Sequence, residues 1–169
     1  MLEQDVKDYI DRSVLCWLAT VDGDQPSVSP KEIFTYYGDD TIIIANIASP
    51  QSMKNISHNN KICVSFVDVF SQRGFQVYGV AQKSPLLSDM ELAPDMELAS
   101  NMDPAPDMDK DKLAILQKIA GELFPVKSFI DIKVTKVKPI LAPSYRMFEN
   151  VKEEDMIENA MKTYGVKRA

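Results

Sequence analysis

The clearest chemical signal in the sequence is a run of hydroxyl and amide side chains at the expected start of a short helix. Residues 49–60 read SPQSMKNISHNN, and a serine followed by a proline suits the entry into a helix. The N–H groups of a first helical turn have no partners within the helix, and they lie at the positive end of its dipole. Ser49, Gln51 and Ser52 therefore predict a phosphate site, although plain capping by Ser49 is also typical of this pattern.

A lysine two segments earlier is the second candidate for contact with an anion. Lys31 follows Ser29 and Pro30 in the extended stretch SVSPKEIF, which precedes the strand leading into the Ser49 helix. A lysine at this point can reach a phosphate as a point charge. A lysine on a strand is, however, usually solvated, with its stem along the sheet. Residue types alone leave both interpretations open.

The remaining residue types exclude several other kinds of site. His58 is the single histidine, and Cys16 and Cys63 both lie in apolar runs without metal-ligand spacing. These counts argue against a zinc site and against Ser-His-Asp or Cys-His catalysis. The acids show no paired spacing that would indicate glycoside chemistry. We therefore expect no metal, and we expect His58 to be a surface residue near the end of its helix.

Composition narrows the class of partner. The chain has 169 residues, 45% of them hydrophobic, and a formal net charge of −6. An acidic chain repels phosphate backbones, so we expect no nucleic-acid partner. No apolar run is long enough for a membrane helix, and the charged N-terminus lacks a secretory core. With two cysteines that look like buried thiols, these features predict a cytoplasmic protein without a membrane partner.

Hydrophobic patterning predicts a mainly β protein in one domain, residues 1–169. Strands are expected at 14–21, 26–37, 41–47, 61–69, 75–82 and 129–142. Helices are expected at 3–12, 49–60, 110–123 and 152–164. Six strands with short turns and few helices favour a small antiparallel barrel.

An acidic, methionine-rich insertion at about 84–110 interrupts this pattern. Methionine recurs there every six residues, each followed by an acid: Met90, Met96, Met102 and Met108. An acidic flexible loop that expanded by duplication is the favoured interpretation. A thioether site for a soft metal or partner, and a lid, are the alternatives.

Three segments in order resemble the pyridoxamine 5′-phosphate oxidase-like family of flavin proteins. They are VLCWLATVDGDQPSVSPKEIF, TIIIANIASPQSMKNISHNNKICVSFVD and RGFQVYGVAQ. The resemblance covers about residues 5–82, and 127–145 more loosely. It implies a six-stranded antiparallel split β-barrel that binds flavin mononucleotide (FMN) at a homodimer interface.

The resemblance also implies roles for individual residues. Ser29, Pro30 and Lys31 would lie along the flavin ring and ribityl chain, and Ser49, Gln51 and Ser52 would hold the phosphate. Asn55 would brace the same helix. Arg73 would add a charge near the ring or substrate, or else be a solvated loop arginine. Many relatives have a basic residue where Gln51 stands, which leaves less charge on the phosphate here.

The implied function is an FMN-dependent oxidoreductase acting on a small molecule or with a nicotinamide donor. Hydride transfer needs no acidic or basic side chain, because the cofactor carries the chemistry. True pyridoxamine phosphate oxidases have an arginine-rich signature near the C-terminus, where this chain offers only Arg146, so we do not expect that substrate. The alternatives are a non-enzymatic flavin, electron or haem carrier, the last dependent on His58, and a structural dimer with a decayed site.

Overall fold

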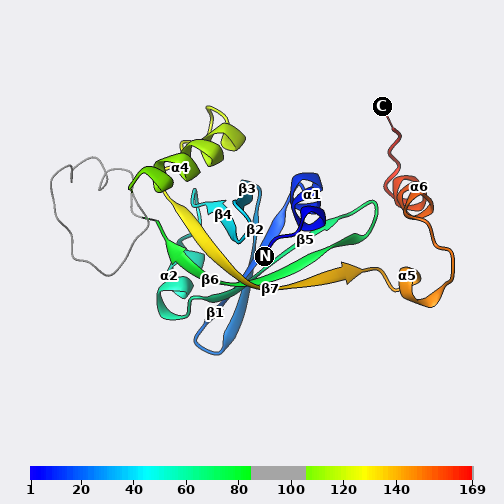
Figure 1. Ribbon diagram of the computed structural model, residues 1–169, viewed down its shortest axis with the longest axis horizontal. Helices are drawn as coiled ribbons and strands as arrows, with labels where there is room; N and C mark the ends of the chain where they lie inside the picture. Colours follow the sequence, from blue (N-terminus) through cyan, green and yellow to red (C-terminus); the bar gives the residue numbers. More distant parts are fainter. Residues whose placement is uncertain (85–105, 169) are drawn as a thin grey trace.

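The computed structural model describes residues 1–84 and 106–168, and it is built on one curled antiparallel sheet (Figure 1). The sheet order is β2-β1-β5-β6-β7-β4-β3. The strands are β1 (Cys16–Asp22), β2 (Gln25–Lys31), β3 (Phe34–Tyr37), β4 (Thr41–Ala45), β5 (Lys61–Asp68), β6 (Arg73–Lys83) and β7 (Phe129–Leu141). The helices are α1 (Gln4–Arg12), α2 (Pro50–His58), α4 (Pro106–Ala120), α5 (Ser144–Met147) and α6 (Glu153–Tyr164). The prediction of a mainly β split barrel is confirmed.

The strand count of six was wrong, because the single strand expected at 26–37 is two strands. β2 pairs with β1 at one edge of the sheet, whereas β3 pairs with β4 at the opposite edge. The chain bends at Glu32 and Ile33 to pass from one edge to the other. Pro30 is tolerated in β2 because this strand is an edge strand and needs fewer ladder donors.

The main core lies on the concave face of the sheet and is closed by α1. Tyr9 from this helix meets Phe75 edge to face, with ring centroids 5.7 Å apart, and Phe75 in turn packs on Phe66. Val6 and Ile10 are buried in the same cluster. The apolar spacing of residues 3–12 thus gives an amphipathic helix whose apolar face fills the barrel.

Strand β4 is buried on both faces, which explains its unbroken apolar run. Ile42 and Ile44 belong to the main core, while Ile43 belongs to a second cluster beneath α4. Leu113 and Leu116 of α4 cover Ile43. A strand between two apolar layers needs no polar residues at alternate positions. This explains why Ile42, Ile43 and Ile44 are consecutive apolar residues instead of alternating with polar ones.

Other sequence expectations have mixed outcomes. The helix expected at 110–123 begins earlier, at Pro106, and ends at Ala120.

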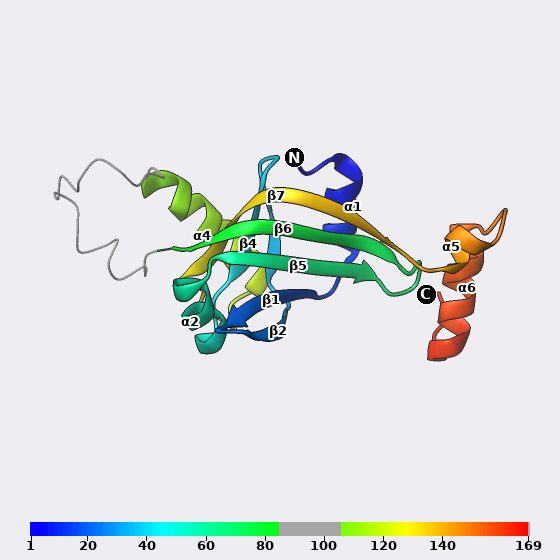
Figure 2. The same ribbon diagram turned by 90° about the horizontal axis from the view of Figure 1, so that it is seen from below.

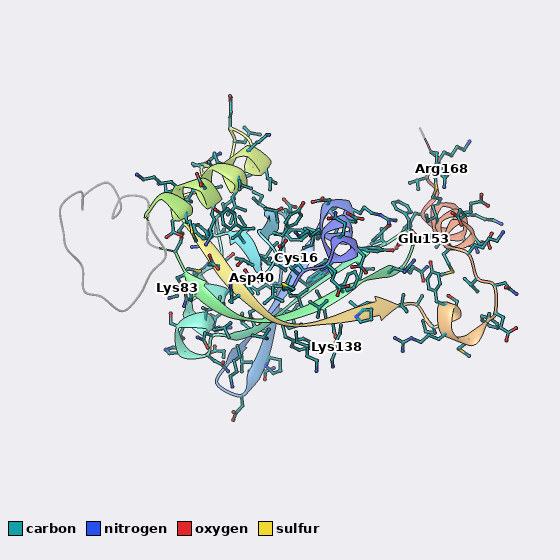
Figure 3. All side chains as sticks on the ribbon, in the orientation of Figure 1. Cys16, Asp40, Lys83, Lys138, Glu153 and Arg168 are labelled. Carbon is teal, nitrogen blue, oxygen red and sulfur yellow. The ribbon has the colours of Figure 1, made fainter. Side chains whose placement is uncertain are left out.

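Both cysteines are free; Cys16 is fully buried (labelled in Figure 3), but Cys63 is only half-buried. Within residues 1–84 and 106–168, no helix has the length and apolar character needed to cross a membrane. Most of the methionine-acid repeat lies outside the described residues.

The C-terminal helices stand at the far end of the sheet from α2 and α4 (Figures 1 and 2). Glu153, at the start of α6 and labelled in Figure 3, accepts hydrogen bonds from Arg12 of α1 (3.0 Å) and Arg73 of β6 (2.7 Å). Tyr164 adds an edge contact to Phe70. Two ion pairs from separate elements therefore attach this helix to the barrel.

We expect Glu153→Gln to loosen α6. Burial alone would raise the pKa of Glu153, but hydrogen bonds from Arg12 and Arg73 lower it below its usual 4.5. The stabilisation from the carboxylate is therefore present above pH 4.5 and lost as the pH falls through the lowered pKa. In the variant, docking of α6 should weaken by about 1 kcal/mol at pH 7. Hydrogen exchange of the amides of 153–164 measures this change.

Glu154→Gln is the matched control, because Glu154 lies in the same first turn but is exposed. Equal exchange rates in the two variants would show that the ion pairs of Glu153 do not hold the helix.

Candidate functional site

The site forms where the end of β2 meets the start of α2. The ammonium Nζ of Lys31, the last residue of β2, donates a hydrogen bond to Ser49 Oγ at 2.6 Å. Two residues before Lys31 in β2, the hydroxyl oxygen of Ser29 lies 3.1 Å from that of Ser52 in α2. The helix packs on β1 beside the β1–β2 hairpin (Figure 2). The structure therefore brings together residues 18 to 23 positions apart that the sequence had proposed as one site.

Lys31 is a buried cation without a carboxylate partner. Its exposed fraction is 8%, and no ion pair to it occurs in the part of the chain that the structure describes. Burial lowers the pKa of Lys31. Burial also raises the pKa of Cys16, to about 12, so that thiol stays protonated. An unpaired buried charge is costly, so this arrangement suits a site that an anion completes.

A second buried lysine shows what a purely structural arrangement looks like in this protein. Lys112 of α4 is 4% exposed, and its ammonium lies against the carboxylates of Asp131 and Asp109. The rings of Tyr37 and Phe129 cover it at 5.2 and 5.8 Å. Lys112 thus has its counter-charge within the chain, whereas the partner of the Lys31 ammonium in the described segments is a serine hydroxyl.

Ser49 occupies the position before α2, but its side chain does not cap the helix. Its hydroxyl instead accepts the hydrogen bond from Lys31, and the capping interpretation of this serine is wrong. Pro50 follows as the first helical residue and has no N–H. The helix start therefore offers its backbone donors and the hydroxyls of Ser49 and Ser52 on the side facing Lys31.

Gln51 and Asn55 form a polar chain that fixes α2 on the β1–β2 hairpin. The side-chain nitrogen of Gln51 donates to Asp22 Oδ2 (3.0 Å) and to Asn55 Oδ1 (2.7 Å). Asn55, fully buried, donates in turn to Thr20 Oγ1 at 2.9 Å. Asn55 therefore braces the helix, and the donors of Gln51 are already in use. Sequence reasoning missed Asp22 and Thr20, because nothing in the DGDQ turn indicates a contact 29 residues away.

A cavity of about 360 Å³ opens beside Lys31 and Ser49. Its other walls are mostly apolar, from Leu15, Pro30, Ile33, Ala45, Ile47, Ala48 and Phe124, with Glu32 at the lining as well. A second cavity of about 450 Å³ shares the wall of residues 47–49 and is lined by Asn46, Pro50, Met53, Lys83, Ser84 and Ser128. Both volumes fall in the range of small-molecule sites. Phe124 was not predicted, since it follows α4 and reaches the cavity only through the fold.

Three other candidate residues lie outside this cluster. Arg73 pairs with Glu153 at the end of the sheet that carries α6. Arg146 is exposed in α5, also at that end (Figure 2). His58 is exposed at the last residue of α2. Among the described residues, no group of three or more His, Cys, Asp or Glu side chains is placed to hold a metal ion.

Comparison with solved structures supports the fold. The HupZ protein of Group A Streptococcus is 25% identical over 83% of this chain and 100% of its own, with a TM-score of 0.62. A putative pyridoxamine 5′-phosphate oxidase from Lactobacillus delbrueckii is 22% identical over 81% of this chain and 93% of its own, with a TM-score of 0.58. An FMN-binding protein from Syntrophomonas wolfei is 18% identical over 81% of this chain and 84% of its own, with a TM-score of 0.57.

No curated protein matches the sequence. The family model described as pyridoxamine 5′-phosphate oxidase matches residues 2–124, which include every strand but β7 and all the residues clustered around Lys31 and Ser49. The chain therefore belongs to the pyridoxamine 5′-phosphate oxidase family.

Proposed function

We propose that the protein binds FMN and is a flavin-dependent oxidoreductase acting on a small molecule. The observation that carries this proposal is the buried Lys31, whose ammonium meets a hydroxyl at the start of a helix and no carboxylate within residues 1–84 and 106–168. The likeness to an FMN-binding protein of the same fold supports it. An anionic ligand would supply the counter-charge that the described part of the chain lacks.

The residues present fit such a cofactor. Lys31, the hydroxyls of Ser49 and Ser52, and the first backbone N–H groups of α2 would hold the phosphate. Ser29 and Pro30 would lie along the ring and ribityl chain, and the apolar cavity beside them would exclude water. Gln51 would contribute its backbone N–H, because its side-chain donors are occupied. When bound, the flavin would accept or donate a hydride, which requires no further acid or base from the chain.

These observations support a haem carrier and a pyridoxamine phosphate oxidase less than they support a flavin site. A haem carrier would depend on His58, which is exposed and lines neither of the two cavities. Pyridoxamine phosphate as substrate would call for several basic residues near the C-terminus, and Arg146 belongs to α5, which lies at the opposite end of the sheet from α2 (Figure 2). We propose instead a small substrate or a nicotinamide donor that approaches the exposed face of the flavin.

We further propose that the protein is a homodimer that uses the convex face of β2, β1, β5 and β6. Residues directly opposite each other in an antiparallel sheet share a face. Trp17 lies opposite Pro30 on one side and Ser65 on the other, and Ala19 lies opposite Val28 and Cys63. Trp17 and Val28 are 47% and 59% exposed. An apolar face of this kind on a single chain is typical of a surface covered by a partner, and the second copy is the partner that the family resemblance implies.

We expect Trp17→Glu to give a monomer, because it would bury a charge in the centre of that interface. Light scattering coupled to size-exclusion chromatography measures the mass. Val14→Glu is the control, since Val14 is 84% exposed but precedes β1 and pairs with none of the described strands. A monomeric unsubstituted protein, or an unchanged mass in Trp17→Glu, would refute the proposed interface.

We expect Lys31→Met to raise the Kd for FMN about tenfold to a hundredfold, since it removes a charge-assisted hydrogen bond to the phosphate. Fluorescence titration of FMN-depleted protein measures this. Lys61→Met, an exposed lysine of β5, should leave the Kd unchanged. Protein that takes up no FMN at all would overturn the proposed function.

The same variant should stabilise the flavin-free protein. Because burial lowers the pKa of Lys31, the folded state holds this proton less tightly than the unfolded chain. The stability of the unsubstituted apoprotein should therefore rise as the pH increases toward 10.5, and Lys31→Met should lack that rise. Thermal unfolding at a series of pH values, with Lys61→Met as reference, tests the sign.

Oxidation of a reduced nicotinamide by the FMN-loaded protein distinguishes an enzyme from a carrier. With dioxygen in the buffer as the final electron acceptor, turnover that exceeds the bound flavin many times supports the oxidoreductase, whereas a single reduction without turnover supports a flavin carrier.

A further inference from the structure

We propose that Phe124 packs against the flavin ring in the cavity beside Lys31, and that Gln117 of α4 holds Phe124 in that position. This inference rests on the proposed function, because it assigns to the ring of the same ligand a contact that the phosphate-binding residues do not make. The helix α4 lies at the same end of the sheet as α2 (Figure 2), so the segment that follows α4 can reach the cavity.

Phe124 brings an aromatic ring to a cavity whose other walls are aliphatic or polar. It lines this cavity together with Lys31 and Ser49, and no other aromatic side chain is among the described residues that line it. Flat aromatic rings attract one another in offset-stacked or edge-to-face contacts, beyond the gain from buried area. The cavity therefore offers one side chain of the kind that a flavin ring would contact favourably.

The Phe124 ring is not used to build the core. It is 50% exposed, and it belongs to neither of the two apolar clusters. Val126, two residues later, is by contrast 5% exposed and packs in the cluster beneath α4. Half of the Phe124 side chain thus remains for a ligand to cover, and covering apolar surface stabilises a complex.

The backbone that carries Phe124 is fixed at both ends. The helix α4 ends at Ala120, and Gly121 turns the chain at a φ of +70°, in the left-handed region that favours glycine. The N–H of Gly121 donates to the backbone oxygen of Gln117 at 3.0 Å. Val126 anchors the other end in the core. Phe124 therefore lies on a short segment between two anchors.

The side chain of Gln117 bridges this segment from within. Its amide nitrogen donates to the backbone oxygens of Gly121 (2.6 Å) and Phe124 (3.3 Å), and its Oε1 accepts from the N–H of Val126 (2.8 Å). These partners fix the orientation of the amide, because carbonyl oxygens require the NH₂ and an N–H requires the oxygen. One side chain thereby holds three backbone groups, so Gln117 is the positioning residue for Phe124.

The first experiment measures the Kd of FMN by fluorescence titration of flavin-free protein. Phe124→Ala should raise the Kd about fivefold to fiftyfold, because it removes both the covered apolar area and the contact between rings. Phe124→Tyr, which keeps the ring, should stay within about twofold of the unsubstituted protein. Leu123→Ala is the matched control and should leave the Kd unchanged, since Leu123 is 87% exposed and does not line the cavity.

The absorption spectrum of the bound FMN separates a contact with the ring from a contact with the phosphate tail. The shoulders of the long-wavelength flavin band sharpen when the ring leaves water. At saturating FMN they should therefore weaken in Phe124→Ala and persist in Lys31→Met.

The second experiment tests Gln117 by a double-mutant cycle. Gln117→Met keeps the length of the side chain but removes its three hydrogen bonds, and it should raise the Kd of FMN by no more than Phe124→Ala does. In a Phe124→Ala background it should have no further effect, since the ring that Gln117 positions is gone. Gln117→Glu, which keeps the acceptor for Val126 and loses both donors, takes its place if Gln117→Met does not fold.

Two results would overturn the inference while leaving FMN binding intact. One is a Kd or a flavin spectrum that Phe124→Ala changes no more than Leu123→Ala does. The other is an effect of Gln117→Met that is equally large with and without the Phe124 ring, which would make Gln117 a brace of the loop alone. Protein that takes up no FMN overturns the proposed function as well.

Discussion

The architecture depends on the short passage in which the chain leaves one edge of the sheet and enters the other. Between Lys31 and Phe34 the backbone bends through Glu32 and Ile33, so that β2 and β3 lie at opposite ends of the strand order. This crossing brings the edges of the sheet together and directs the last side chain of β2 inward. As a result, Lys31 is buried beside Ser49, and the cavity opens between the crossing, the 45–49 segment and Phe124.

Burying Lys31 in this way costs stability, which its surroundings must offset. The α2 helix is fixed on the hairpin by Ser52 with Ser29, by Asn55 with Thr20 and by Gln51 with Asp22. Behind it, the strands carry a core of fully buried Leu18, Val64 and Phe66. Proteins commonly retain side chains that cost folding stability where those side chains bind a ligand. Lys112, which has both acids and aromatic rings around it, shows that this chain can neutralise a buried lysine where no ligand is expected.

The two ends of the sheet have different characters. At the end that carries α2 and α4, polar and apolar residues around the start of α2 line two cavities. At the other end, Arg12, Arg73 and Glu153 form an ion-pair network that attaches α6 to α1 and β6. Within one chain, Arg73 pairs with Glu153 at the end of the sheet that carries α6. Its expected place near the flavin would require the partner subunit, because only a second copy could bring it to a cavity at the opposite end.

Periodicity and turn chemistry in the sequence by themselves determined the elements and their class. The alternation in 75–82 and 129–142, the Asp-Gly turn and the Ser-Pro helix start are local signals, and they predicted strands and a helix to within a few residues. The free backbone donors at the start of α2 were also predictable, since they belong to any helix N-terminus.

Only the tertiary structure decided which of these groups meet. It split 26–37 into two strands, because hydrogen bonding to different neighbours leaves no local mark at Glu32 and Ile33. It decided that the Lys31 ammonium meets a hydroxyl and, among the described residues, no carboxylate, that the Ser49 side chain does not cap its helix, and that Gln51 turns its donors toward Asp22. Each of these facts depends on a distance between residues far apart in the chain, and such distances are set by sheet order and packing rather than by residue type.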